Sequence, residues 1–407
     1  RIEMNITTRI NRSFMTGMFL ISTAACTLHT SNSESVTPMP QSVAKQVLPA
    51  PESVMATMEK VANWQIARTQ YMPHVGRAQK GSESYGRWIQ GAFYVGLTEL
   101  AERSPNSFYE TWMGYVGNAH DWKMGKVKYF ADDHVIGQMN LWYYNRHSNA
   151  EALEPVKQTL DWLIEQNPTN SLEFIAGRNK DNLHNCQWRW CWADALFMAP
   201  PTFYALSDIT GDEKYIEYAH REFKATVDYL LDPKTGLIFR DSRYFDRKGK
   251  YGEQIFWSRG MGWVYAGVVN SIEALPEGHK YRQYYEDLYL QLTTAIIKRQ
   301  KRDGSWPMSL LAGEQDTYPE SSGTAFYTYG LLWGVNQGLL EKQEYMPKIM
   351  KAWTVLTNSV HPDGKFGWVQ GVNDKPDVVA YEDSQLYGVG AFLLAGSQMH
   401  DLTSKSH

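Results

Sequence analysis

One carboxylate stands in an unusual place in this sequence. Asp194 follows Trp188, Trp190 and Trp192 at the start of an apolar run that extends to Leu206. Burial among aromatic side chains raises the pKa of a carboxyl group, which would make Asp194 a proton donor near neutral pH, whereas a place in the first turn of a helix lowers it. The structural alternative is that Asp194 caps a helix by accepting hydrogen bonds from its backbone amides. This stretch alone leaves both interpretations open.

The elements that would position Asp194 form a repeating pattern. Six amphipathic segments alternate with six apolar, glycine-containing ones. The amphipathic segments are 53–68, 107–116, 152–166, 213–231, 281–301 and 341–360, and the apolar segments are 88–97, 133–144, 192–206, 257–275, 322–340 and 383–399. Such a repeat of helix hairpins predicts an all-α fold, an (α/α)6 barrel, in which outer helices show a polar face to solvent and inner helices are buried. We expect one catalytic domain over residues 52–400.

The amino-terminal residues have the order of a secretory signal. Arg9 and Arg12 precede an apolar stretch from Phe14, and small residues precede Cys26, so residues 1–26 are predicted to be a signal peptide. Cleavage by signal peptidase and lipoprotein-type processing with lipid on Cys26 are both open. Residues 27–51 are rich in Ser, Thr and Pro and are predicted to be a flexible linker. The sequence therefore predicts an exported protein of the periplasm or cell surface, whose membrane contact would be a lipid anchor.

Composition excludes some classes of partner. The net charge is −4 and no basic stripe is present, which argues against nucleic acid. The chain has 15 Trp and 25 Tyr, and flat aromatic side chains suit the apolar faces of sugar rings, although they serve equally well in a core. Cys186 and Cys191 fit no standard zinc spacing and would form either a local disulfide or two buried thiols. No metal or cofactor is implied.

Polar and aromatic residues gather in the loops that lead into the apolar segments. In a barrel, the amino-terminal ends of the inner helices face one cavity and polarise it positively. Arg259, between Trp257 and Trp263, would add a fixed cation for an anionic ligand, or would pair with a carboxylate on an outer helix. Together with Asp194, the other candidates for proton transfer are Asp133, His134 and His184, and each histidine fits a satisfied core position equally well. An acidic sugar suits this set of residues.

Several motifs resemble a known family. The segments 192–201, 257–264, 318–325 and 387–396 are similar to those of the unsaturated rhamnogalacturonyl or glucuronyl hydrolases of glycoside hydrolase family 105, which is related to family 88. The resemblance runs in order from about Trp88 to Met399. It implies an (α/α)6 barrel, without metal or cofactor, that removes a 4,5-unsaturated uronic acid from the non-reducing end of oligosaccharides released by polysaccharide lyases.

The resemblance also assigns roles to residues. Asp194 corresponds to the general acid and base that protonates C4 of the sugar while water adds at C5. Asp133, which opens the motif ending at Gln138, resembles the second active-site carboxylate, with Asp132 as a neighbour one residue away. Arg259 would hold the uronate carboxylate. The remaining expected substrate contacts are Trp192, Trp257, Trp263, His134, His184, Ser322 and Thr324.

Two rival interpretations remain from the sequence. The adjacent pair Asp132 and Asp133 superficially fits an (α/α)6 glycosidase of the mannanase type, which acts on saturated glycans. A non-catalytic, sugar-binding lipoprotein would have the same aromatic residues without turnover. Within the preferred interpretation, the parent polysaccharide stays open, because ulvan, pectin and rhamnogalacturonan all yield the same type of unsaturated terminus, glucuronyl or galacturonyl, and differ in the neighbouring sugar.

Overall fold

The computed structural model describes residues 47–69, 84–175 and 185–405. The predicted signal peptide, most of the predicted linker and His184 lie outside these residues. Gln46–His407 forms one compact unit, and its first helix, α1, begins at Pro51, the last residue of the predicted linker. Within the described ranges, no helix combines the length and the apolar character needed to cross a membrane.

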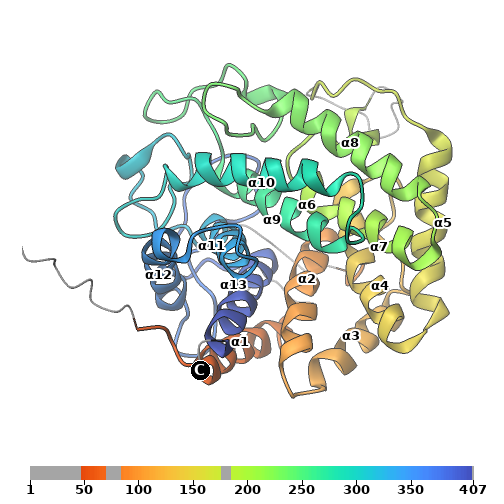
Figure 1. Ribbon diagram of the computed structural model, residues 1–407, viewed down its shortest axis with the longest axis horizontal. Helices are drawn as coiled ribbons and strands as arrows, with labels where there is room; N and C mark the ends of the chain where they lie inside the picture. The colour runs from red at the N-terminus through yellow and green to blue at the C-terminus, as the bar shows by residue number, and fades with distance from the viewer. Residues whose placement is uncertain (1–46, 70–83, 176–184, 406–407) are drawn as a thin grey trace, which may run out of the picture. The chain divides into compact units, whose positions relative to one another are not determined.

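In the part of the chain that the structure describes, six inner helices form a closed ring, whose course can be followed in Figure 1. Each packs against the next, and the last packs against the first. They are α2 (Trp88–Arg103), α4 (Ile136–His147), the interrupted pair α6 (Ala195–Met198) and α7 (Pro200–Thr210), α9 (Ser258–Ala274), α11 (Ser321–Asn336) and α13 (Leu386–Ser404). The predicted (α/α)6 barrel is therefore confirmed.

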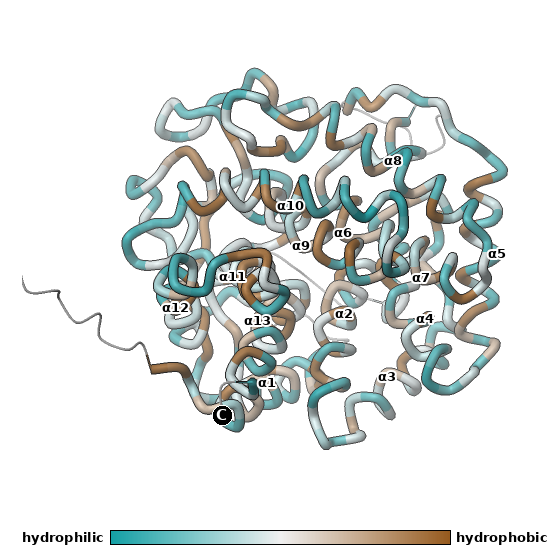
Figure 2. The backbone as a smooth tube through the Cα atoms, viewed as in Figure 1, coloured by the Kyte–Doolittle hydropathy of each residue, from teal (hydrophilic) through white to brown (hydrophobic). Residues whose placement is uncertain are grey.

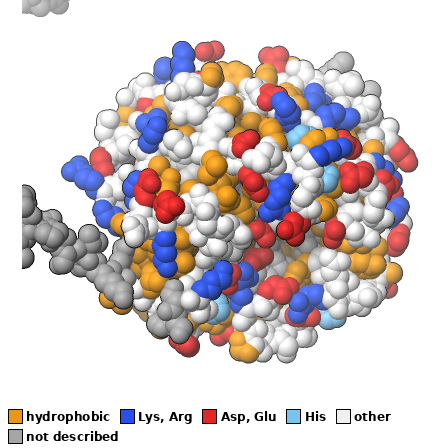
Figure 3. Space-filling view, viewed as in Figure 1, with side chains coloured by type: hydrophobic (Ala, Val, Ile, Leu, Met, Phe, Trp, Pro, Cys, Tyr) orange, Lys and Arg blue, Asp and Glu red, His pale blue; other side chains and the backbone are white. Residues whose placement is uncertain are grey.

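Among the described residues, six outer helices surround this ring, one for each inner helix. They are α1 (Pro51–Ile66), α3 (Phe108–Ala119), α5 (Ala150–Gln166), α8 (Lys214–Leu230), α10 (Arg282–Ile297) and α12 (Lys342–Asn358). Hydrophilic residues are conspicuous along α10 and α12 in Figure 2. Acidic and basic side chains are interspersed over the face drawn in Figure 3. In α11, by contrast, every residue from Ser321 to Val335 is buried. The amphipathic and the apolar segments of the sequence thus differ in hydrophobic pattern, because an outer helix has a single apolar face and an inner helix is enclosed on all sides.

Glycine allows two inner helices to touch through their backbones. A Cβ atom on Gly96 of α2 would overlap the carbonyl oxygen of Gly390 on α13, and a Cβ atom on Gly390 would overlap the carbonyl oxygen of Ala92. A side chain of any size would separate the two helices. The loss of helix propensity that accompanies glycine is therefore offset by close packing where the ring closes.

Two inner segments do not begin as the α-helices that the sequence predicts. The predicted helix 133–144 starts with a 3-10 turn, Ala131–Val135, before α4. The predicted helix 192–206 is broken between α6 and α7, where Pro200 cannot donate the backbone hydrogen bond that a continuous helix needs. Both irregular stretches lie at the amino-terminal end of the ring, beside the candidate site.

Candidate active site

Asp194 immediately precedes α6 and is 9% exposed. Its side chain makes no capping hydrogen bond to the helix. Instead, its Oδ2 accepts a hydrogen bond from Nε of Arg240 at 3.1 Å. The capping interpretation therefore does not describe Asp194, whose carboxylate is turned toward a buried cation.

A second buried carboxylate, Asp132, interacts electrostatically with Asp194. Its Oδ1 accepts a hydrogen bond from the indole nitrogen of Trp192 at 3.0 Å. Burial raises the pKa of Asp132 well above its usual value, and the charge of Asp194 raises it further. Burial also raises the pKa of Asp194, although Arg240 and Arg259 oppose the shift. Two carboxyl groups in such a place titrate as a pair, which favours retention of a proton toward neutral pH.

Asp133, the predicted second carboxylate, is directed elsewhere. Its Oδ1 accepts a hydrogen bond from the backbone nitrogen of Trp88 at 2.9 Å and lies 3.4 Å from Nε of Arg87. Gly125, at a φ of +62°, approaches Oδ2 so closely that a Cβ atom there would overlap it. Asp133 thus fastens the first turn of α2 to the loop before α4. Its neighbour Asp132, which the sequence analysis placed second, interacts electrostatically with Asp194, and a catalytic role for Asp133 stays a prediction.

Arg240 is a site residue that the sequence analysis missed. It lies in the long connection between α8 and α9, and its Nη1 donates to Oδ2 of Asp241 at 2.8 Å. Asp241 is fully buried and is bound by two nitrogens of Arg243, each at 2.8 Å. Burial raises the pKa of Asp241, but Arg243 and Arg240 outweigh that effect and hold it below its usual value. Asp241 is therefore an ionised anchor that keeps Arg240 against Asp194.

Arg259 occupies a cage of aromatic rings. Its guanidinium carbon lies 4.4 Å from the ring centroid of Trp257 and 4.5 Å from that of Tyr387, and the residue is only 2% exposed. Within the described part of the chain, no carboxylate forms an ion pair with it. The alternative that Arg259 pairs with an outer-helix carboxylate is therefore not supported, although its charge acts on Asp194.

The hydrogen bonds of Arg259 leave part of its guanidinium group available. Nη1 donates to the carbonyl oxygen of Gln370 at 2.9 Å and to the hydroxyl of Ser322 at 3.3 Å, and Nη2 donates to the carbonyl oxygen of Gly371 at 2.8 Å. Arginine has five N–H donors. Nε–H and one N–H of Nη2 have no protein partner among the described residues. Together they form the edge that binds a carboxylate in bidentate fashion.

The three predicted tryptophans are all buried but differ in what they contact. Trp192 stacks on Phe130, with ring centroids 5.7 Å apart, and Trp257 donates from its indole nitrogen to Gln370 at 2.8 Å. Trp263 instead packs between aromatic rings of α6 and α11, with its closest centroid, that of Phe326, at 4.6 Å. Trp192 and Trp257 are thus attached to Asp132 and Arg259, whereas Trp263 contributes to the core beneath them.

Other predicted contacts fall in the packing around the site. The Nε2 atom of His134 lies 2.7 Å from the carbonyl oxygen of Lys128, and burial lowers the pKa of this histidine to about 4. His134 thus fits the core alternative, because it is fully buried and neutral. Thr324, also fully buried, donates to the carbonyl oxygen of Glu320 at 2.8 Å, at the start of its own helix. Ser322 is the one of these three that contacts Arg259.

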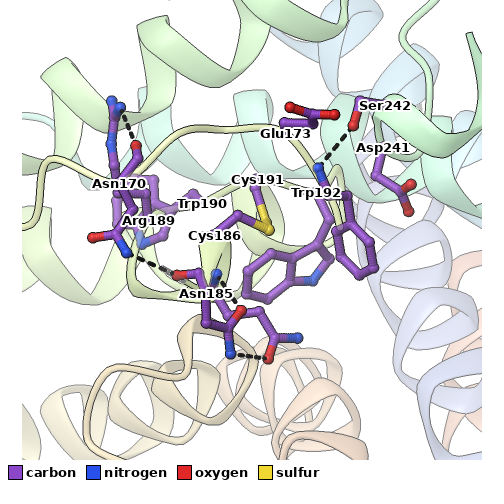
Figure 4. Close-up of a disulfide and its surroundings, with 12 residues drawn as sticks. Asn170, Glu173, Asn185, Cys186, Arg189, Trp190, Cys191, Trp192, Asp241 and Ser242 are labelled. Carbon is purple, nitrogen blue, oxygen red and sulfur yellow. Dashed lines mark hydrogen bonds between the residues drawn. A yellow bond between two sulfur atoms is a disulfide. The ribbon is translucent and has the colours of Figure 1, made fainter. Parts of the chain in front are cut away.

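A disulfide joins Cys186 to Cys191, with Cα atoms 5.7 Å apart. Figure 4 shows the sulfur atoms beside the indole ring of Trp192. The alternative of two buried thiols is therefore wrong in this structure. The disulfide fixes the short loop that precedes Trp192 and Asp194. In the described ranges, no three His, Cys, Asp or Glu side chains converge as metal ligands would.

Comparisons with known proteins bear on this geometry. Residues 57–403 match the model of Glycosyl Hydrolase Family 88. The chain is 42% identical over 349 residues to an "Unsaturated 3S-rhamnoglycuronyl hydrolase" of Alteromonas sp. (strain LOR), covering 84% of each chain. It is 33% identical to a protein of the same name from Formosa agariphila, covering 77% of this chain and 84% of the other.

Solved structures show the same architecture. A structure described as glycosyl hydrolase family 88 from Bacteroides vulgatus superposes with a TM-score of 0.74 at 27% identity, covering 86% of this chain and 99% of that one. An unsaturated glucuronyl hydrolase from Streptococcus agalactiae superposes with a TM-score of 0.62 at 16% identity, covering 87% and 94%. At that low identity, the second match bears on the fold alone.

Proposed function

The chain belongs to glycosyl hydrolase family 88, and from this premise we propose that it removes a 4,5-unsaturated uronic acid from the non-reducing end of oligosaccharides that polysaccharide lyases release. The observation that carries the proposal is the buried pair of carboxyl groups, Asp132 and Asp194, beside the cations Arg240 and Arg259. An acid that retains its proton toward neutral pH is what protonation of an enol ether requires.

The reaction begins with transfer of a proton from Asp194 to C4 of the sugar. The C4=C5 double bond supplies the electron pair, and the positive charge left at C5 is shared with the ring oxygen. Water then adds at C5 and returns a proton to Asp194. The resulting hemiketal opens, and the hemiacetal exposed at C1 releases the remaining saccharide. Because the carbon that is protonated belongs to the double bond, the distance rule for paired glycosidase carboxylates does not apply.

Arg259 would hold the uronate carboxylate, which is attached to C5. The two unoccupied donors on one edge of its guanidinium group match a carboxylate in bidentate geometry. A sugar held there by its C5 substituent has the double bond next to the anchored group. Trp257 closes one face of Arg259, so the cation cannot turn toward another partner. Trp192 would border the sugar on the side of Asp132.

The substrate is proposed to carry a rhamnose next to the unsaturated uronate. The two relatives described above are named unsaturated 3S-rhamnoglycuronyl hydrolases, and this name supports a rhamnose-containing polymer as the parent polysaccharide, for which we propose ulvan. Export to the periplasm or cell surface, with Cys26 as the candidate lipid attachment site, is part of the same proposal. The disulfide between Cys186 and Cys191 supports it, because such bonds persist in oxidising compartments.

The test follows the ultraviolet absorbance of the unsaturated uronate with purified protein and lyase digests of ulvan and of pectin. We expect the absorbance to fall with the ulvan digest and to fall more slowly or not at all with the pectin digest. Asp194→Asn should retain binding, measured by calorimetry, and lose turnover by at least about a hundredfold. Release of reducing ends from intact saturated polysaccharide would instead favour a mannanase-type enzyme. Binding by the wild type without loss of absorbance would favour a sugar-binding protein.

A further inference from the structure

The two sides of the site belong to connections that lie far apart in the chain. On one side, Arg240 contacts Asp194 and is held by Asp241. On the other side, Arg259 is bound by backbone carbonyl oxygens of the loop 370–375. The distance between the proton donor and the proposed uronate-binding cation therefore depends on contacts between these two connections.

Arg243 makes such a contact. Its Nε and Nη2 donate to the two carboxylate oxygens of Asp241, and its Nη2 also donates to Oδ2 of Asp374 at 2.7 Å. The ring of Phe174 covers the guanidinium group, with its centroid 3.9 Å from the guanidinium carbon. Because an arginine donates in the plane of its guanidinium group, this stacking leaves the donors directed at the two carboxylates. Arg243 thus joins Asp241 to a residue 131 positions further from it in the chain.

The loop that carries Asp374 is anchored by Gln370, which is almost completely buried. The side chain of Gln370 accepts from the indole nitrogen of Trp257 and donates to the carbonyl oxygen of Lys375, both at 2.8 Å. The second of these bonds closes the loop around Asp374. Since the backbone of Gln370 also binds Arg259, Asp374 is held by the same frame that holds the proposed uronate-binding cation.

The connection that carries Asp241 continues into a short 3-10 turn, η4 (Ser242–Tyr244). Asp241 accepts the backbone amide of Arg243 at 3.0 Å, so the turn and the buried carboxylate are fixed together. The charge of Asp374 also acts on Tyr244 in this turn and raises the pKa of its hydroxyl group, after the larger effect of burial. Asp374 therefore interacts with two side chains of η4.

We propose that Arg243 is a positioning residue of the reaction, because it ties Asp241 to Asp374. This tie fixes Asp194 relative to Arg259. In the sugar, the carboxylate carbon and C4 are two bonds apart, so a small change in the distance between acid and cation misplaces the proton. The proposal rests on the proposed function, because it requires the uronate to be held while C4 is protonated.

The test measures kcat and KM with the lyase digest that the wild type hydrolyses. In Asp374→Ala, kcat should fall about tenfold while KM stays within about twofold of the wild type, because Arg259 keeps its anchors and the acid loses its alignment. Asp374→Glu restores the carboxylate and should recover part of the lost kcat. Thermal unfolding should show both variants folded, since a partly exposed ion pair contributes little to stability.

The matched control is Glu286→Ala. It breaks an ion pair with Arg282 on α10, an outer helix, where the two side chains are 3.0 Å apart. Glu286 is 27% exposed and Asp374 is 33% exposed, so the two substitutions remove comparable ion pairs. Glu286→Ala should leave kcat and KM unchanged.

A double-mutant cycle tests the tie itself. If Arg243 and Asp374 act as one unit, Arg243→Gln/Asp374→Ala should lose no more kcat than Arg243→Gln alone, whereas independent effects would multiply. Losses that multiply, or an unchanged kcat in Asp374→Ala, would overturn the proposal. A rise in KM at constant kcat would overturn it as well and would make Asp374 part of a substrate-binding surface.

Failure of the proposed function has a different signature. If the wild type hydrolyses no digest, the proposed function is wrong, and hydrogen exchange of the intact protein decides whether the tie exists. Backbone amides of residues 241–245 should then exchange faster in Asp374→Ala than in the wild type, and at the wild-type rate in Glu286→Ala. Equal rates in all three proteins would overturn the proposal.

Discussion

Replacement of Arg240 by glutamine should move the pH range in which the enzyme is active. Arg240 lies 3.1 Å from Asp194 and lowers the pKa of Asp194, against the larger effect of burial. A general acid works in its protonated form, so activity is present below its pKa and is lost as the pH rises through it. Without the cation, the pKa of Asp194 should rise. The alkaline limb of the rate profile of Arg240→Gln should therefore lie at higher pH than that of the wild type.

The size of the shift follows from the geometry. Two unit charges about 4 Å apart interact by about 4 kcal/mol at an effective dielectric constant of about 20, which corresponds to about 3 pKa units. The side chains of Arg240 and Asp194 are 13% and 12% exposed, so solvent screens the pair only weakly. Arg259 remains in the variant, and glutamine can still donate a hydrogen bond. We therefore expect a shift of about 1–2 units, to be read from kcat and kcat/KM across pH.

Arg240→Lys is the matched control, because it retains the charge while losing the planar fork that reaches both Asp194 and Asp241. Its alkaline limb should stay within about half a unit of the wild type. Thermal unfolding of both variants shows whether the protein remains folded, as Asp241 should still be held by Arg243. An unchanged alkaline limb in Arg240→Gln, combined with a large rise in KM, would refute the reasoning and would make Arg240 a substrate ligand instead.

Three further predictions concern the same framework. In Asp132→Asn, the free energy of unfolding should match that of the wild type in acid but exceed it by about 1–2 kcal/mol in mildly alkaline buffer. The reason is that the raised folded-state pKa of Asp132 stabilises the wild type at low pH, and this stabilisation is lost as the pH rises through that pKa. Denaturant titrations at the two pH values measure the difference. Cys186→Ala/Cys191→Ala should cost about 2 kcal/mol of stability and lower kcat several-fold, with KM less affected, since the loop before Trp192 is released. Gly96→Ala should destabilise the barrel by about 1–3 kcal/mol in calorimetric unfolding, since the added methyl group overlaps Gly390.

The helical framework could be predicted because the hydrophobic pattern of each segment indicates how deeply its helix is buried. The segment 257–275, expected to be an inner helix, forms α9 from Ser258 to Ala274. An enclosed helix is apolar on all sides and an outer helix on one side, and both patterns are visible within about 20 residues of sequence. The breaks were less predictable. The segment 192–206 is divided into α6 and α7 at Pro200. The sequence shows that a proline interrupts the hydrogen bonds of a helix, but it does not show where in the ring this interruption will lie.

The site was harder to predict because side-chain direction depends on single-residue register. Asp132 and Asp133 are adjacent in a 3-10 turn, so their carboxylates diverge, one toward Trp192 and the other toward Trp88. Sequence spacing cannot choose between them. The role of Arg240 was even harder to predict, because the sequence shows only an arginine followed by an aspartate. Its contact with Asp194 spans 46 positions and forms only when the helix hairpins close into a ring.

The electrostatics of the site are consistent with a balance between burial and charge. Burial alone would leave the carboxyl groups of Asp132 and Asp194 neutral, able to give up a proton but reluctant to remain as anions when the sugar has taken it. Arg240 and Arg259 lower the free-energy cost of the buried Asp194 anion, but the pKa of Asp194 stays raised. Asp241 in turn neutralises part of the charge of Arg240, which limits how strongly Arg240 stabilises the anion. An acid that must donate a proton to carbon and then recover one from water needs both states within reach. A buried pair of carboxyl groups between two arginines, one of them itself paired, provides that condition.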